Sequence, residues 1–368
     1  MKLSRRCALA LLPSLAVSTL PAAANGVRRG RAIVLPRDHG AHLDTRIEWW
    51  YATGWLGLPE APSHGFQVTF FRSLTGLAQG LPGRLAPRHI LFAHAALTDL
   101  AARRHLHDQQ LQRWNGETGN EASPRVAGAA VDDTRVWIGQ WSLQRDDSGY
   151  RARVDSQAGG QPWSLDLQLQ TRQPLLLQGD AGYSRKGPLE HQASLYYSQP
   201  QLGVSGSLGL GGQRIAASGR AWIDHEWSDQ ILPADAVGWD WAGFNLFDGS
   251  ALTVFQLRRA DGSALWAGGS QRSPGSAPST FASDALRWQP DRRWRSTVTG
   301  AEYPLQWQLD TPAGRFTVRA LLDAQELDSR GGTGTVYWEG LSELLDADQR
   351  RVGLGYLEMT GYAGRLRL

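Results

Sequence analysis

The sequence has little cysteine, lysine or methionine, and its charges are nearly balanced. Of the 368 residues one is cysteine, Cys7, and two are methionine. A single cysteine cannot form a disulfide within the chain, which excludes a disulfide-stapled scaffold. The 38 Lys and Arg residues exceed the 35 Asp and Glu residues by three, and Lys2, Arg5 and Arg6 account for that excess. Scattered arginines on a neutral chain form no basic patch, so we expect no nucleic-acid partner.

The first 24 residues have the pattern of a secretory signal peptide. A basic start precedes the apolar run from Cys7 to Leu20, and the small residues at 21–24 predict a cleavage site near Ala24. The alternative, a membrane anchor, needs about 20 apolar residues, and Pro13 and Ser14 interrupt this run. Either the general secretory or the twin-arginine route fits Ser4-Arg5-Arg6. We expect a periplasmic or secreted protein whose mature chain has no transmembrane segment.

From residue 46 onward, short segments rich in Trp, Val, Tyr and Thr alternate with turn residues. This texture, with turns such as Asp248-Gly249 and Asp261-Gly262, favours antiparallel sheet closed into barrels or sandwiches, so the predicted fold class is all-β. Only Leu97 to Leu111 has apolar residues near helical spacing, and we predict a loop or short helix there. The predicted strands are 47–56, 65–71, 90–98, 136–143, 150–154, 163–169, 194–197, 221–227, 239–246, 251–257, 305–309, 316–321, 335–338 and 355–360.

Two segments resemble each other. An aromatic strand with Trp49-Trp50-Tyr51 precedes a second strand that ends in Arg72, and Trp239-Asp240-Trp241 likewise precedes a strand that ends in Arg258. One such unit in each half predicts two related β domains in tandem. We place a signal peptide at 1–24, an N-terminal domain at 25–228 and a C-terminal domain at 229–368.

Several well-known catalytic motifs are missing. There is no Gly-x-Ser-x-Gly nucleophile elbow. A phosphate-binding Gly-x-x-x-x-Gly-Lys loop is also missing, since Lys186 is the only lysine after the signal peptide. The pair His225-Glu226 lacks the second histidine of a zinc motif, because Asp229 stands in its place. Asp38, His39, His42 and Asp44 could gather around a metal, but such spacing is common in solvated loops. We therefore predict neither a metal nor a cofactor.

The segment 221–228 is the richest in chemistry. If it is a strand, His225 and Trp227 share one face, and Asp224 and Glu226 share the other. An imidazole beside an indole in a barrel lumen could act as an acid-base unit, because histidine titrates near neutrality and an indole face stabilises cations. The alternative is a buried histidine whose hydrogen bonds are satisfied, with Trp227 as core packing.

Two further aromatic strands carry acids. Glu48 shares a face with Arg46 and Trp50, where it could orient a ligand or act as a general acid, or form a structural ion pair with Arg46. Trp239 and Trp241 share one face and Asp240 takes the other, and the sequence leaves open whether Asp240 points inward. The glycine-rich loop 179–187, with its adjacent Arg185 and Lys186, could gate a cavity or hold an anionic group, or be a plain turn.

Longer motifs resemble those of the AttH and carotenoid 1,2-hydratase (CrtC) family. The resemblance runs from about residue 36 to 362 and is strongest to the secreted AttH branch. The motifs that carry it are Asp38 to His42, Glu48 to Gly54, Gly65 to Arg72, Ala93 to Asp99, Gln178 to Gly187, Ala221 to Ser228, Gly238 to Trp241, Tyr337 to Gly340 and Gly355 to Tyr362.

The resemblance implies two lipocalin-like domains and cofactor-free addition of water to an isoprenoid double bond. That chemistry needs a proton donor, an aromatic face to stabilise a carbocation, and a water molecule. The His-x-Trp pair of the hydratases falls on His225 and Trp227. Their Tyr and Asp pair has no match of the same type and spacing; Trp239 and Asp240 lie in the corresponding region.

Two functional hypotheses follow. In the first, the protein is a hydratase or hydrolase of a hydrophobic isoprenoid or lipid ligand. Its catalytic residues are then His225, Trp227 and Asp240, and its ligand contacts are Glu48, Trp50, Trp239 and Trp241. In the second, the protein is a non-catalytic carrier of such a ligand. The resemblance adds an ABC-transporter permease as an expected partner.

Overall fold

The structure is a computed structural model that describes residues 26–77, 86–120, 123–124, 126–230 and 232–365. The predicted signal peptide and its cleavage site lie outside these residues. Within them the regular structure consists of β-strands and three short 3₁₀ segments, η1 (Arg37–His39), η2 (Ala158–Gly160) and η3 (Ser283–Ala285). The all-β prediction is confirmed. No helix in this part of the chain has the length and apolar character needed to cross a membrane.

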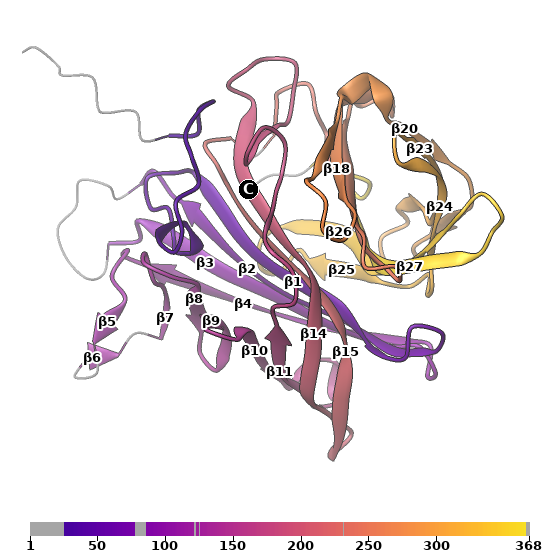
Figure 1. Ribbon diagram of the computed structural model, residues 1–368. Helices are drawn as coiled ribbons and strands as arrows, with labels where there is room; N and C mark the ends of the chain where they lie inside the picture. Colours follow the sequence, from indigo (N-terminus) through magenta and orange to yellow (C-terminus); the bar gives the residue numbers. More distant parts are fainter. Residues whose placement is uncertain (1–25, 78–85, 121–122, 125, 231, 366–368) are drawn as a thin grey trace, which may run out of the picture.

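The first sheet has 13 strands, all antiparallel, in the order β4-β3-β2-β1-β15-β14-β11-β10-β9-β8-β7, with β12 and β13 also paired to β14. Its first strand, β4, lies against β7 and β8, so the sheet curls into a nearly closed barrel (Figure 1). Its strands are β1 (Ile47–Gly57), β2 (Pro62–Leu74), β3 (His89–Asp99), β4 (Arg104–Trp114), β7 (Ala127–Ala129), β8 (Arg135–Ile138), β9 (Trp141–Asp146), β10 (Gly149–Ser156), β11 (Trp163–Gln170), β12 (Leu176–Leu177), β13 (Tyr183–Arg185), β14 (Ala193–Leu210) and β15 (Gln213–Ser228).

The second sheet has 10 strands in the order β19-β18-β17-β16-β27-β26-β24-β23-β20, with β25 paired to β26. Its strands are β16 (Gly238–Leu246), β17 (Ala251–Arg258), β18 (Ala264–Arg272), β19 (Ser279–Phe281), β20 (Arg287–Pro290), β23 (Gln306–Thr311), β24 (Gly314–Ala320), β25 (Glu326–Ser329), β26 (Thr335–Leu345) and β27 (Arg351–Thr360). Two small hairpins join β5 (Gly119–Asn120) to β6 (Ser123–Pro124) and β21 (Arg293–Arg295) to β22 (Glu302–Pro304).

Both sheets repeat one strand order. In each, four consecutive strands form a meander, and the first of the four pairs with a strand from the end of its unit, β1 with β15 and β16 with β27. The two aromatic motifs noted in the sequence begin these meanders, as the hairpins β1–β2 and β16–β17. The change of sheet falls between Ser228, where β15 ends, and Gly238, where β16 begins.

The prediction of a loop or short helix over 97–111 is wrong. Those residues form the end of β3, a turn and most of β4, with Leu97 directly opposite Leu106. The turn contains Arg103 with a positive φ of 52° and no glycine or proline, so its sequence carries no turn signal. The strand β4 is mostly polar and only partly buried, as suits an edge strand, and it therefore lacks the alternation that marks a strand.

Among the described residues the three largest apolar cores account for most of the buried apolar side chains. One fills the barrel of the first sheet and a second lies inside the curved second sheet. The third lies between the two sheets and joins Tyr51 and Trp222 of the first to Trp241 and Tyr356 of the second. Close docking requires Gly65 in β2, where an added Cβ would lie 2.7 Å from the Tyr356 hydroxyl. The two outer faces that meet here also enclose the cleft described below.

Candidate functional site

Strand β15 supplies side chains to two different sites. His225 and Trp227 point into the barrel, where Trp50 stacks on His225 with ring centroids 5.0 Å apart. Asp224 and Glu226 point the other way, into a cleft between the two sheets. The alternation predicted for 221–228 is therefore present, but it separates the histidine from the cavity.

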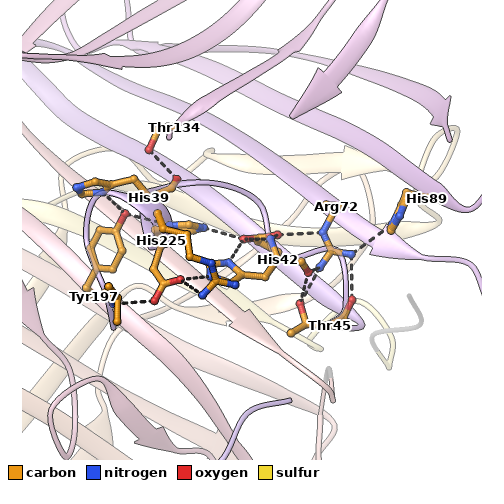
Figure 2. A network of polar contacts seen from close by, with 12 residues as sticks. His39, His42, Thr45, Arg72, His89, Thr134, Tyr197 and His225 are labelled. Carbon is orange, nitrogen blue, oxygen red and sulfur yellow. Dashed lines mark hydrogen bonds and ion pairs between the residues drawn. The ribbon is translucent and has the colours of Figure 1, made fainter. Parts of the chain in front are cut away.

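The barrel side holds a buried polar cluster, and Figure 2 shows its members His42, Arg72 and His225. The cluster surrounds Glu48, which has no exposed surface. One carboxylate oxygen, Oε1, lies 2.7 Å from His42 Nδ1 and 2.9 Å from His225 Nε2. The other oxygen, Oε2, accepts hydrogen bonds from Arg72 Nε and from the His42 amide, both at 2.9 Å. Arg72 also donates to the Thr45 carbonyl at 2.9 Å. Every charge in this centre is paired or hydrogen-bonded, as burial requires.

Outer groups fix the far side of each imidazole. His42 Nε2 lies 3.2 Å from Asp38 Oδ1, and His225 Nδ1 lies 3.0 Å from the Tyr197 hydroxyl, which contacts His39 Nδ1 at 2.7 Å. The η1 segment delivers Asp38 and His39 to these positions. His42 also stacks on Trp227 at 3.7 Å between ring centroids. The ring orientations are thus set by their surroundings.

The cluster shifts the pKa values of its members in opposite directions. Burial opposes ionisation of Glu48, but His42, His225 and Arg72 outweigh it and hold its pKa well below the ordinary value. Burial also lowers the pKa of His225, against the pull of Glu48. For His42 the charges of Glu48 and Asp38 exceed the burial effect, and its pKa is raised. The cluster is built to keep Glu48 ionised.

Three of these residues could reach one metal ion, because ligand atoms of His42, Glu48 and His225 lie within 4.8 Å of one another. The same atoms already hydrogen-bond to each other, and Arg72 occupies the second oxygen of Glu48. The cluster is therefore satisfied by its own side chains. Of the loop considered for a metal in the sequence, Asp38 and His42 meet here, and Asp44 is exposed.

Asp240 lies in neither the polar cluster nor the cleft. It is fully buried inside the second sheet, 2.8 Å from Arg258 Nε, and it accepts hydrogen bonds from Gln256 and from the Tyr362 hydroxyl at 2.8 and 3.0 Å. The Asp240–Arg258 pair links β16 to β17, as Glu48–Arg72 links β1 to β2. The first hairpin of each sheet thus contains a buried acid–arginine pair, with Glu48 directly opposite Arg72 and Asp240 opposite Gln256, two residues before Arg258.

The cleft between the sheets contains about 920 Å³ of empty space, including solvent at its mouth. Its walls come from the outward faces of β1, β2 and β15 on one side and of β16, β17, β26 and β27 on the other. Half of the lining residues are aromatic or aliphatic, and carboxyl groups lie among the rings. The lining residues are Ile47, Trp49, Tyr51, Thr69, Phe71, Lys186, Ser194, Asp224, Glu226, Ser228, Gln230, Leu232, Trp239, Trp241, Phe255, Leu257, Glu339 and Glu358.

Two of the carboxyl groups come from β15 and have partners. Glu226 Oε1 forms an ion pair with Lys186 Nζ at 2.9 Å and accepts a hydrogen bond from Ser194. Asp224 accepts hydrogen bonds from the Tyr196 hydroxyl and from Trp222 Nε1, both at 2.7 Å. Even so, burial raises the pKa of Asp224 to about 7. Asp224 and Glu226 are neighbours with different partners.

The other two, Glu339 and Glu358, lie directly opposite each other on β26 and β27. Burial raises the pKa of Glu339 well above its ordinary value, and the neighbouring Glu358 adds to the rise. Burial also raises the pKa of Glu358 to about 8, with Asp224 and Glu226 contributing. Two like charges this close cannot both form readily, so the pair holds a proton at neutral pH.

The structure divides the residues expected from the sequence. Trp239 and Trp241 line the cleft, whereas Glu48, Trp50, His225 and Trp227 belong to the buried cluster. The acids of the cleft, Asp224, Glu226, Glu339 and Glu358, have no role predicted from the sequence. An ionisable residue inside an otherwise apolar strand was the available signal, and Tyr337 to Gly340 and Gly355 to Tyr362 both show it.

Comparison with known proteins places this architecture. A protein of Nitrosomonas europaea described as an AttH is 41% identical over 92% of this chain and 99% of its own, with a TM-score of 0.80. Kievitone hydratase from Nectria haematococca shares the fold at 14% identity, over 86% of this chain and 89% of its own, with a TM-score of 0.62. Among curated proteins, none matches the sequence.

The family assignment rests on nearly the whole described chain. The model of the family described as AttH-like matches residues 26–362, which confirms the resemblance seen in the sequence motifs. The chain belongs to the AttH-like family.

Proposed function

We propose that the protein is a cofactor-independent enzyme that adds water to a carbon–carbon double bond of an isoprenoid or other lipidic ligand held in the cleft between its sheets. The observation that carries the proposal is the set of four carboxyl groups, Asp224, Glu226, Glu339 and Glu358, in a cleft walled by aromatic rings. Burial raises the pKa of three of them, Asp224, Glu339 and Glu358, and buried acids with raised pKa values beside a cavity are the usual mark of acid-base chemistry.

The environments of the acids assign them different roles. The Glu339–Glu358 pair holds a proton near neutral pH and serves as the general acid. Glu226, ion-paired with Lys186 at 2.9 Å, serves as the base. Two carboxyl groups whose surroundings differ in this way can act as acid and base in one site.

The proposed reaction conserves atoms and charge. The acid transfers its proton to one alkene carbon, and the π electrons form the new C–H bond, which leaves a carbocation on the other carbon. Aromatic faces of Trp239 and Trp241 stabilise that charge. Water then attacks the cation through oxygen and loses a proton to Glu226. Proton transfer from Glu226 back to the Glu339–Glu358 pair restores the site, and the net change is alkene plus water to alcohol.

Fold similarity to a hydratase supports this class of reaction. Kievitone hydratase has the same two-sheet architecture with a TM-score of 0.62, although at 14% identity the likeness extends to fold alone. Its name is that of an enzyme that adds water to its substrate. The proposed role of the cleft depends on the acids of this chain and not on any residue of that protein.

The test is turnover of acyclic polyenes and of kievitone by purified protein, with isotope-labelled water and mass spectrometry to detect the added oxygen. We expect Glu339→Gln with Glu358→Gln to reduce kcat by a factor of about 10² to 10⁴, since the general acid is lost. The same assay decides the role expected for the cluster. If His225→Ala or Trp227→Phe abolishes kcat in folded protein while both Gln variants stay active, the reaction belongs to the barrel cluster instead.

A carrier role is the second candidate, and the aromatic cleft favours it equally as a binding site. A carrier would bind polyenes or lipids, with quenching of tryptophan fluorescence and no product. It would then hand its ligand to a membrane partner such as an ABC-transporter permease, from the periplasm or outside the cell. Pull-down of such a permease by the ligand-loaded protein, with empty protein as control, tests that proposal.

A further inference from the structure

We infer that the cleft selects a positively charged centre, so that its preferred ligand class is an organic ammonium group on an apolar chain. The inference rests on the cleft of the proposed function and names the charge that its occupant carries. It concerns binding, so it can be tested without turnover.

The first support is the excess of acids over cations in the lining. Four carboxyl groups reach the cleft, and Lys186 is the only cation among the lining residues. Lys186 is already paired with Glu226. Within the described residues no ion pair reaches Asp224, Glu339 or Glu358. Glu339, a residue only 2% exposed, has an oxygen, Oε1, without a hydrogen-bond partner, and its one polar neighbour on the lining with an effect on its pKa besides Glu358 is the neutral Tyr51 hydroxyl. A buried carboxyl oxygen without a partner on a cavity wall calls for a donor or a positive charge.

The second support is the chemistry of the walls. Trp49, Trp239 and Trp241 present indole rings to the cleft, together with the rings of Tyr51, Phe71 and Phe255. The face of an aromatic ring attracts cations, and tryptophan does so most strongly. Aromatic walls with a carboxylate behind them form the usual cage for quaternary ammonium ligands.

The third support is an ammonium group that already lies against this wall. Lys186 Nζ is 4.2 Å from the centre of the Phe255 ring and 4.8 Å from that of Tyr196. It reaches from the residue after β13 of the first sheet to Phe255 on β17 of the second. The protein therefore holds one cation of its own between rings and a carboxylate at one side of the site.

The charges that face the cleft also determine how binding depends on pH. Six ionisable side chains line the cleft. They are Tyr51 on β1, Lys186 just after β13, the β15 pair Asp224 and Glu226, Glu339 on β26 and Glu358 on β27. A bound cation stabilises ionised carboxyl groups, so it releases protons from those that are still protonated. We therefore expect affinity for a cation to rise between about pH 6 and pH 9, and affinity for a neutral ligand to stay level.

The experiment compares three probes by tryptophan fluorescence and calorimetry: octyltrimethylammonium, its neutral isostere with a tert-butyl group in place of the ammonium, and octanoate. We expect the ammonium to bind roughly tenfold tighter than the isostere at pH 8. Proton release, measured in two buffers of different ionisation enthalpy, should accompany the ammonium alone. Equal affinities for ammonium and isostere across the pH range, or tightest binding of octanoate, would overturn the inference.

Variants locate the effect. The double variant Glu339→Gln, Glu358→Gln should lower the preference for ammonium to about twofold or less, since the amides cannot ionise. The control is Glu343→Gln on the same strand β26, where Glu343 pairs with Arg319 and Arg351 at 2.5 and 2.6 Å and does not line the cleft. A control that loses the preference equally contradicts the assignment. If the cleft prefers ammonium but no turnover is found, only the hydratase proposal is refuted. If turnover is found but ammonium is not preferred, only the cation site is refuted.

Discussion

His225 Nε2 lies 2.9 Å from Glu48 Oε1, across the paired strands β1 and β15, and this contact lies at the centre of a fully buried charge cluster. It joins two strands whose opposite faces form the cleft. Since Trp49 and Tyr51 flank Trp50, and Asp224 and Glu226 flank His225, the cluster and the cleft are built from alternate residues of the same strands. A substitution that destabilises the cluster is therefore expected to destabilise the strands that form the cleft as well.

Removal of the central carboxylate should be strongly destabilising. Glu48→Ala leaves Arg72 buried without its counter-charge, and we expect the free energy of unfolding to fall by about 3–5 kcal/mol. Chemical denaturation measures the loss. The matched control is Asp166→Ala, which breaks an exposed pair with Arg151 and should cost less than about 1 kcal/mol. Equal losses in the two variants would show that the cluster is not a stabilising unit.

The buried histidines should destabilise the protein in mild acid, between about pH 6.5 and pH 4. Burial lowers the pKa of His39 and of His89 to about 4, and the unfolded value is about 6.5. In this range the unfolded chain therefore binds more protons at these two imidazoles than the native state does. Their contribution to the free energy of unfolding falls as pH drops from about 6.5 to about 4. His42, whose pKa is raised, and the cleft acids Asp224 and Glu358, whose pKa values are raised to about 7 and about 8, oppose this in part.

Urea unfolding between pH 7 and pH 4 measures this slope. His89→Gln should reduce this slope, because the unfolded chain then has one imidazole fewer to bind a proton. Replacing the exposed His191 with Gln should leave it unchanged. A slope that His89→Gln does not alter would contradict the assignment of the shift to burial of this imidazole.

The acids of the cleft should cost stability in alkali. Burial raises the pKa of Glu358 to about 8, against about 4.3 in the unfolded chain. The native state keeps this proton longer, so its contribution to stability is full below about pH 4.3 and is lost as pH rises through 8.

Glu358→Gln should therefore unfold at higher temperature than the parent protein at pH 9, with a gain of about 1–2 kcal/mol, while any turnover decreases. Glu60→Gln, at an exposed position, provides the control in the same thermal scan. A Glu358→Gln protein less stable than the parent at pH 9 would mean that ionised Glu358 does not destabilise the folded protein.

Contact between the sheets should depend on the absence of a side chain at Gly65. Gly65→Ala places a methyl group 2.7 Å from the Tyr356 hydroxyl and 2.9 Å from Leu341 Cβ. We expect a loss of about 1–3 kcal/mol and weaker binding of cleft ligands, measured by thermal unfolding and fluorescence titration. Gly331→Ala, which meets nothing within 4 Å, should change neither. Unchanged ligand binding in a destabilised Gly65→Ala protein would separate docking of the sheets from the shape of the cleft.

The sequence pattern predicts the strands better than it predicts what they face. Alternation in 221–228 correctly separates His225 from Asp224 and Glu226, because side-chain direction follows from the strand itself. Which face meets a cavity depends on how the second sheet docks, and residues 100 or more positions away decide that: Glu339 and Glu358 complete a site begun by β15.

The cluster shows the same limit at shorter range. Glu48 was considered as a partner of Arg46, on the same face of its strand. Its actual ion pair is with Arg72, directly opposite on β2. Arg46 is exposed. The register between two strands decides which side chains face each other. Register depends on long-range packing, which the sequence of one strand does not reveal.

Alternation along β15 has a consequence for how this segment can vary. An insertion or deletion of one residue within 221–228 would exchange the two faces, so that the imidazole would enter the cleft and two carboxyl groups would enter the barrel. The barrel would then contain uncompensated acids beside Glu48, and the chain would be expected to misfold before any ligand was met. A change of length by one residue is better tolerated outside this segment, for example at the exposed Gly211 and Gly212 between β14 and β15.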